Sequence, residues 1–427
     1  MLVRVDLRGI PGDLRANLAR PAAAGEDVGA AVAALIDEVR SDGDAALRRL
    51  TARFDGCEID ELRVAPEAMA DALANTEPSL RAALELARDQ IAAWHEAQRE
   101  KEARREMLGV QVQELVSPVD RAGCYVPGGR ASYPSTVLMT AVAARVAGVP
   151  EVVLCVPPGP DGRVPSSVLA AAALAGVDEV YRVGGAQAIA AMAFGTESIR
   201  RVDVIVGPGN AYVAEAKRQV FGTVGIDGLA GPSEVAVIAD ATVDPEWVAA
   251  DLLAQAEHGP GGAVTLITWD DAVADRVDLA LETLVLTATR CDEAEATLAS
   301  GGRTVLVTEP ERAVDVANAI APEHLELMCA DAALLVPLVR SAGAVFVGAY
   351  APAVLGDYVA GTNHVLPTGG TARFSSALRV ADFQKFIHVV YADADAVHRV
   401  GPAARVIAEE EGLIAHADAV RLREEGP

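Results

Sequence analysis

The sequence lacks the features that would suggest secretion, membrane insertion or a disulfide-based fold. Only five of its 427 residues are cysteines, and none forms a Cys-x-x-Cys pair: Cys57, Cys124, Cys155, Cys291 and Cys329. Neither a thiolate zinc cage nor a disulfide framework is therefore indicated. The N-terminal stretch has no apolar core of signal-peptide length, and no later window offers about eighteen uncharged apolar residues. We expect a soluble cytoplasmic protein.

Positive charge and aromatic residues are also scarce. The 36 Lys and Arg residues are outnumbered by 61 Asp and Glu, which gives a formal net charge of −25. The negative electrostatic field of such a charge repels phosphate backbones and anionic lipid, so we expect neither nucleic acid nor a membrane as partner. Aromatic residues make up 4% of the chain, but 51% of it is hydrophobic, which is typical of a well-packed globular protein. The length suggests roughly two to four domains.

The pattern of apolar residues changes near Arg121. Before it, apolar residues at helical spacing predict two helices over 28–54, interrupted at Ser41-Asp42-Gly43-Asp44, and a longer helix over 79–103. His95-Glu96 begins like a zinc-protease helix motif but lacks its second histidine, so we interpret it as surface helix. After Arg121, short β-branched runs alternate with Ala-rich helical ones, which predicts an α/β fold with parallel strands and crossover helices. The predicted strands are 151–156, 179–183, 202–206, 235–239, 263–268, 304–308 and 344–347.

Glycine-rich junctions follow several of these strands, at 126–129, 183–186 and 206–210. In an open α/β sheet, ligands bind beyond the carboxyl ends of the strands, where such turns fall. The segment Gly207-Pro208-Gly209-Asn210 precedes a predicted helix, but Tyr212 stands where a dinucleotide fingerprint has its third glycine. Its backbone amides could meet a phosphate, and a purely structural strand-to-helix turn fits equally well.

A possible cation site lies at the end of the helix predicted over 244–257, which Gly259-Pro260 terminates. Gln255 and His258 are three residues apart and share one face of it. The negative end of the helix dipole favours a cation there, although a simple capping histidine is the alternative and glutamine is an unusual zinc ligand. Asp357 and His364, on a glycine-punctuated loop, and His416 near the C-terminus offer further ligands, while an ordinary turn is an alternative role for Asp357.

Glu323 and His324 form the second chemical constellation. A carboxylate beside an imidazole supplies two groups that can exchange protons near neutral pH. Adjacent residues do not face each other on a helix, so the pair would have to flank a substrate from a loop or a helix start. A solvated helix start without a chemical role remains the alternative.

Nine segments, taken in order, resemble the histidinol dehydrogenase family. They are GCYVPGG (123–129), YPSTVLM (133–139), VGGAQAIAA (183–191), VGPGNAYVAEAKRQV (206–220), AGPSEV (230–235), DLLAQAEHGP (251–260), APEHLEL (321–327), GDYVAGTNHVLPTGGTARFSS (356–376) and EGLIAHADAVRLR (411–423). The resemblance implies a zinc ion, one per subunit, and NAD+ as cofactors. It assigns zinc ligation to Gln255, His258, Asp357 and His416, proton handling to Glu323 and His324, substrate contact to Ser233, Glu411, His324 and the zinc ligands, and NAD contact to Tyr125, Gln187 and Asn210.

The resemblance also implies an architecture. Two incomplete, doubly wound Rossmann-like domains carry small N- and C-terminal extensions that are exchanged in a homodimer, so that His416 reaches the partner subunit's site. We place an N-terminal arm at 1–24 and a helical C-terminal tail at 379–427. The larger domain, with the metal and acid/base residues, takes 25–124 and 234–378. The second, nucleotide-contacting domain takes 125–233.

The activity implied is the oxidation of L-histidinol through L-histidinal to L-histidine with two NAD+, in histidine biosynthesis. His324 is expected to serve as base in both oxidations and Glu323 to activate water, while zinc orients the substrate. A related dehydrogenase of another small amino or sulfonated alcohol, a zinc hydrolase and a non-catalytic binding protein are the alternatives. For Cys124 and Cys155, we favour a structural role over a covalent bond to the aldehyde, because buried thiols are usually inert.

Overall fold

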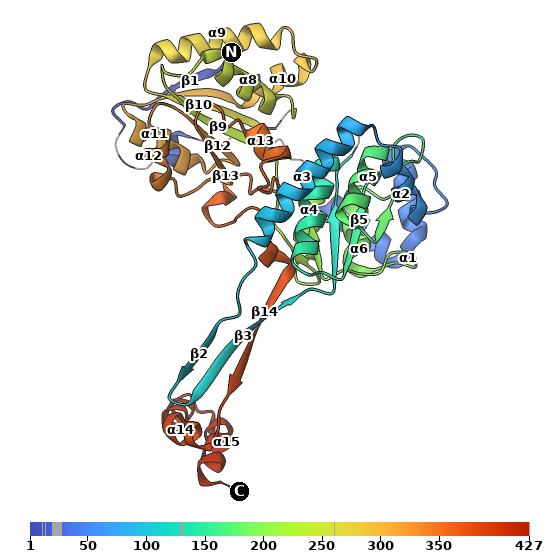
Figure 1. The fold of residues 1–427 in the computed structure, drawn as a ribbon, viewed down its shortest axis with the longest axis vertical. Helices are drawn as coiled ribbons and strands as arrows, with labels where there is room; N and C mark the ends of the chain where they lie inside the picture. Colours follow the sequence, from blue (N-terminus) through green and yellow to red (C-terminus); the bar gives the residue numbers. More distant parts are fainter. Residues whose placement is uncertain (11, 13, 19–27, 129–130, 260, 427) are drawn as a thin grey trace.

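The computed structural model describes residues 1–10, 12, 14–18, 28–128, 131–259 and 261–426, and it has two α/β lobes and a projecting arm (Figure 1). Residues 19–24 of the predicted N-terminal arm, Gly129 of a predicted junction and Pro260 lie outside these residues. Within the described ranges, no helix has the length and apolar character needed to cross a membrane.

One lobe is built on a six-stranded parallel sheet. Its strand order is β1 (Val3–Asp6), β11 (Gly302–Leu306), β10 (Ala263–Thr268), β9 (Glu234–Ala239), β12 (His324–Met328) and β13 (Ala344–Val347). Its helices are α8 (Pro245–Ala256), α9 (Asp271–Val285), α10 (Cys291–Gly301), α11 (Pro310–Ile320), α12 (Ala332–Leu335) and α13 (Ala353–Tyr358). Successive side chains of β12 point to opposite faces of the sheet, so Leu325 packs in the cluster on the α11 face and Met328 in the cluster on the α8 face.

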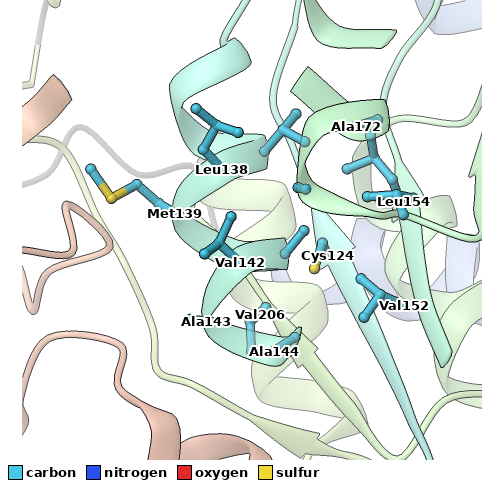
Figure 2. Packing of buried hydrophobic residues seen from close by; sticks show 14 of the residues in the cluster. Cys124, Leu138, Met139, Val142, Ala143, Ala144, Val152, Leu154, Ala172 and Val206 are labelled. Atoms are coloured by element: carbon cyan, nitrogen blue, oxygen red, sulfur yellow. The ribbon is translucent and has the colours of Figure 1, made fainter. Parts of the chain in front are cut away.

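The second lobe has a five-stranded parallel sheet. The order is β6 (Glu179–Tyr181), β5 (Glu151–Cys155), β4 (Arg121–Tyr125), β7 (Val204–Val206) and β8 (Gly225–Ile226). Seven helices of the described chain belong to this lobe: α1 (Gly29–Asp55), α2 (Pro66–Ala74), α3 (Pro78–Glu96), α4 (Pro134–Val146), α5 (Ser166–Ala175), α6 (Gly185–Phe194) and α7 (Ala211–Val220). Figure 2 shows the core on one face, where Cys124 of β4 lies among aliphatic side chains of β5, β7 and α4.

The arm is an antiparallel ribbon of three strands that ends in two helices, far from both sheets (Figure 1). β14 (Gln384–Tyr391) pairs with β3 (Val110–Pro118), which pairs with β2 (Arg104–Met107). At the tip, α14 (Ala394–Glu410) and α15 (Ile414–Glu425) pack on each other. They are separated at Gly412, whose φ of +74° suits glycine. The two predicted helices of the tail are thus confirmed, but 384–391 is a strand, so the tail is not wholly helical.

The predicted alternation is confirmed strand by strand: each of the seven predicted strands overlaps β5, β6, β7, β9, β10, β11 or β13. The predicted interruption at 41–44 is confirmed: Gly43 has the non-helical angles φ +53° and ψ −129°, and this kink divides Gly29–Asp55, labelled α1, into two helical segments. The helix predicted over 79–103 ends at Glu96, because the chain then leaves the lobe to form β2 in the arm.

Two boundaries differ from the predicted domains. The helices of 29–96 and strand β4 belong to the five-stranded lobe, whereas the prediction grouped 25–124 with 234–378: Val32 and Ile36 pack with α6, and Ile91 packs with α4. An amphipathic pattern indicates which helix face is buried but not which sheet covers it. Residues 3–6, predicted as part of an exchanged arm, form an edge strand beside β11 of the same chain.

Candidate active site

The chemically distinctive residues of the six-stranded lobe gather at the amino ends of its strands. Glu234 begins β9 and His324 begins β12, and the two strands are neighbours. α8 ends at the same edge with Gln255 in its last turn. The candidate residues of this lobe therefore lie at the amino edge of the sheet and not at its carboxyl edge. Helix C-termini arrive at an amino edge, and their negative dipole ends favour cations there.

Glu323 and His324 are buried at this edge, with exposed fractions of 6% and 4%. His324 Nδ1 donates to the backbone oxygen of Glu234 at 3.2 Å, and Nε2 lies 3.4 Å from Oδ1 of Asp357. Glu323 Oε2 accepts from the amide of Glu234 at 2.9 Å and lies 3.7 Å from His324 Nδ1, while Ser233 also hydrogen-bonds this carboxyl group. The alternative of a solvated helix start is wrong, because the pair opens a buried strand.

The charges at this edge shift one another's proton affinity. Burial raises the pKa of Glu323 above its ordinary value. Burial disfavours protonated His324, but contact with Asp357 and the charge of Glu323 outweigh it and raise the pKa of His324 to about 9. Burial likewise disfavours ionised Asp357, yet the His324 imidazole keeps the pKa of that carboxyl below its usual range. Two carboxyl groups and one imidazole thus compete for protons at one buried edge.

Three of the four predicted zinc ligands lie at this edge and suit a metal. Gln255 is 6% exposed, and the Nε2 of its side-chain amide has no hydrogen-bond partner. A metal binds an amide through its oxygen, so Oε1 is the atom that Gln255 would offer. His258 Nδ1 contacts the backbone oxygens of Ala254 and Gln255, each at 3.2 Å, so its Nε2 lone pair remains available. The charge of His258 also helps to lower the pKa of Asp357. In the part of the chain that the structure describes, no three His, Cys, Asp or Glu side chains could hold a metal by themselves, so the candidate set depends on Gln255 or on a ligand from elsewhere.

His364 links the two lobes rather than presenting a free imidazole. Its Nδ1 bonds the backbone oxygen of Asp357 at 2.9 Å, and its Nε2 lies 3.1 Å from Thr136 Oγ1 on α4. Both ring nitrogens are therefore engaged within the chain. Next to it, Asn363 bonds the backbone oxygen of Met139 and contacts His95. His95 is fully buried, so our prediction of a surface position was wrong, because the loop at 363–364 covers that face of α3.

Glu411 and His416 are not brought to this edge within one chain. Both are exposed at the tip of the arm, beside and within α15. Figure 1 shows that tip at the opposite end of the molecule from β9 and β12.

The three predicted NAD-contacting residues lie at the carboxyl edge of the five-stranded sheet. Tyr125 ends β4, and its hydroxyl accepts from the amide of Gly185 at 3.1 Å. Gln187, 2% exposed, lies in the first turn of α6, and Asn210 caps α7 by accepting from the amides of Tyr212 and Val213. Thr136, the inter-lobe partner of His364, also follows β4. The carboxyl edge of one sheet therefore adjoins the amino edge of the other.

The thiols of Cys124 and Cys155 are fully buried, and burial raises the pKa of each to about 12. Cys124 lies in the apolar cluster of Figure 2. A thiol that is both inaccessible and protonated does not attack an aldehyde, which agrees with the structural role that we favoured.

Three acidic residues near the candidate site were not identified from the sequence: Asp251, Glu234 and Glu326. Glu326 is 1% exposed on β12, on the same face as His324. The alternation of His324 and Glu326 with Leu325 and Leu327 has the period of a strand and was the signal available.

Comparison with known proteins assigns the family. The model of the histidinol dehydrogenase family matches residues 18–424. Histidinol dehydrogenase of Rhizobium meliloti (strain 1021) is 50% identical over 414 residues, 96% of this chain and 95% of the relative. That of Pseudomonas putida is 49% identical over 393 residues, 91% of this chain and 89% of the relative.

A solved structure agrees over the whole chain. The crystal structure of histidinol dehydrogenase from Elizabethkingia anophelis superimposes with a TM-score of 0.95 at 36% identity, covering 99% of this chain and 98% of that one. An acetylating aldehyde dehydrogenase from Geobacillus thermoglucosidasius, 14% identical with a TM-score of 0.50 over 86% of this chain and 95% of its own, shares the fold alone. With a family model and relatives at about half identity covering nearly its full length, the chain belongs to the histidinol dehydrogenase family of oxidoreductases.

Proposed function

We propose that this enzyme oxidises L-histidinol through L-histidinal to L-histidine, a four-electron reaction that uses Zn²⁺ and two NAD+, in the last steps of histidine biosynthesis. The observation that carries the proposal is the contact series from buried Glu323 and His324 to the partly exposed Asp357, beside Gln255 and His258. It places a proton-exchanging pair next to side chains that suit a metal.

His324 is suited to take the alcohol proton in both oxidations. Because Nδ1 donates to the backbone oxygen of Glu234, Nε2 is the nitrogen left to act as base. With the pKa raised to about 9, Nε2 acts as base in the fraction of enzyme whose imidazole is neutral, and that fraction grows as pH rises towards 9. Glu323 activates the water that hydrates the aldehyde between the two oxidations, and burial moves its pKa towards the range in which a carboxyl group exchanges protons. Hydrogen bonds from Ser233 and the Glu234 amide orient this carboxyl group.

Gln255, His258 and Asp357, joined by His416, would hold the zinc ion, and Tyr125, Gln187 and Asn210 would contact NAD+. When bound, Zn²⁺ supplies a cation that orients the substrate nitrogens, and NAD+ supplies the hydride acceptor. Ser233, Glu411, His324 and the zinc ligands would contact the substrate. The five-stranded lobe is accordingly the nucleotide-contacting domain.

The arm would complete the site of a partner subunit in a homodimer. Its apolar side chains are exposed in the single chain, including Phe386, Ile387, Val390, Tyr391, Val406 and Ile407, each at least 41% exposed. Such a surface is typical of a protein interface. A second copy of this chain would cover it and receive Glu411 and His416.

The ratio of NADH formed to histidinol consumed tests the reaction. Two NADH per histidinol, measured by absorbance and by chromatographic analysis of histidine, is the expected result. A ratio of one would contradict the four-electron reaction and favour a related alcohol dehydrogenase. Absence of NADH with zinc, NAD+ and histidinol supplied would favour a hydrolase or a non-catalytic binding protein.

A further inference from the structure

Two carboxyl groups face each other beneath the candidate zinc site. Glu326 lies on β12 two residues beyond His324, and Asp251 lies on α8 one turn before Gln255. Residues two apart on a strand and four apart on a helix share a face. The Asp251–Glu326 pair therefore lies on the same two elements as His324 and Gln255, but further from the amino edge of the sheet.

The two carboxyl groups lie within hydrogen-bonding reach of each other. Oε2 of Glu326 is buried and has no donor among the described residues, so a hydrogen bond between the two groups needs a proton on one of them. Two ionised carboxylates are both acceptors, so this bond exists only when one of them carries a proton. Burial raises the pKa of both groups, and the negative charge of Asp251 raises that of Glu326 further. Glu326 is 1% exposed, so solvent does not replace the partner.

Glu326 also caps the helix that carries Asp357. Its Oε1 accepts from the amide of Ala353, the first residue of α13, at 2.7 Å. The residue at the N-cap position is Pro352, which makes no side-chain capping bond. A helix of 6 residues leaves most of its first amides unpaired, so an acceptor from a neighbouring strand contributes much of its anchoring. Asp357 lies one turn after Ala353.

We propose that Asp251 and Glu326 are positioning residues, a proton-sharing pair that ties α8 and β12 to the start of α13 and thereby sets the Asp357 carboxylate against Gln255, His258 and His324. The pair joins the three elements that carry the candidate ligands of one chain and the base. This inference rests on the proposed zinc site. A single shared proton also leaves one negative charge fewer near Asp357 than two ionised carboxylates would.

The test compares Glu326→Gln with Glu326→Met. Glutamine can still accept from the Ala353 amide, and its NH2 group can donate to Asp251, so it replaces the shared proton permanently. Methionine has similar length but forms neither bond. Asp244→Ala is the matched control, because Asp244 caps α8 through the Glu246 amide, away from α13.

Zinc affinity of the apoprotein, measured by competition with a chromogenic chelator, is the main readout, and the visible spectrum of bound Co²⁺ reports ligand geometry. We expect Glu326→Met to weaken zinc binding about 10- to 100-fold, the usual effect of losing a group that orients a metal ligand. The Co²⁺ spectrum should change and the KM for histidinol should rise. Glu326→Gln and Asp244→Ala should stay within about threefold of the parent enzyme.

Unchanged zinc affinity and Co²⁺ spectrum in Glu326→Met would overturn the proposal, as would a Gln variant as impaired as the Met variant. If Glu326→Met does not fold, Asp251→Asn and Asp251→Ala provide the same comparison, with retention expected only for Asn. Failure of the parent enzyme itself to bind zinc would contradict the proposed function instead, so the two failures are distinguishable.

Discussion

The amino edge of the six-stranded sheet and the tip of the arm both carry predicted site residues, in very different settings. At the sheet edge, His324 is 4% exposed and contacts Glu234, Glu323 and Asp357. At the tip, His416 is exposed, and the structure shows no side-chain bond for it. One region is organised within a single chain, while the other has side chains ready for a surface outside it. Under the proposed function, the catalytic chemistry and the completion of the site belong to different parts of the molecule.

Replacing His324 with alanine should have the largest effect on turnover. Loss of a general base typically slows a reaction about 10²- to 10⁴-fold, and both oxidations should suffer because one base serves both. Stopped-flow NADH traces with histidinol and, separately, with histidinal measure the two steps. Impairment of the histidinal step alone would show that the base is not shared.

Replacing His416 with alanine should lower activity less, by about 10- to 100-fold, through weaker metal binding. Because the side chain is exposed, the unfolding free energy of the metal-free protein should change by no more than about 0.5 kcal/mol. Chelator competition and thermal unfolding give the two quantities. A large loss of stability with zinc affinity intact would remove the proposed contrast between edge and tip.

A smaller effect is expected in the pH dependence of the unfolding free energy, which should differ between a substitution at the sheet edge and one at the arm tip. The folded pKa of Glu326 is raised by burial and Asp251, with His324 of the same strand opposing, so the folded chain keeps a proton that the unfolded chain releases above about 4.5. Stability from this group is therefore lost as pH rises from 5 towards 8. Glu326→Gln cannot titrate.

We therefore expect the unfolding temperature of Glu326→Gln, relative to that of the parent, to rise by about 2–4 °C between pH 5 and pH 8 when metal is chelated. His416→Ala should show no such relative gain. Parallel pH profiles for the parent and the Gln variant would argue against the shared proton.

The sequence predicted seven of the eleven strands of the two parallel sheets, because runs such as 263–268 are β-branched and apolar, but it did not reveal β1, β4, β8 or, at the candidate site, β12. That strand begins with His324 and contains Glu326, and polar residues there obscure a buried strand. The strands of the arm were missed for a related reason: β2 is exposed throughout and β3 has no buried residue. The lobe to which α1–α3 belong depends on contacts between distant segments, which local periodicity does not encode.

For the site, local patterns left Gln255 and His258 with two interpretations, and the family resemblance selected one. The structure adds what spacing could not predict. The edge is the amino one, His364 is used to join the lobes, and Asp251 with Glu326 lies beneath the candidate ligands. These features depend on which side chains distant segments bring together.

Subunit complementation tests the central claim most directly, namely that the edge of one chain works with the arm tip of another. Equal amounts of His324→Ala and His416→Ala are unfolded, mixed and refolded, so that about half of the dimers carry one of each chain. In such a dimer, one site combines an intact edge with an intact tip, which predicts recovery of about a quarter of the parent activity. Activity no greater than the mean of the two separately refolded variants would contradict the account.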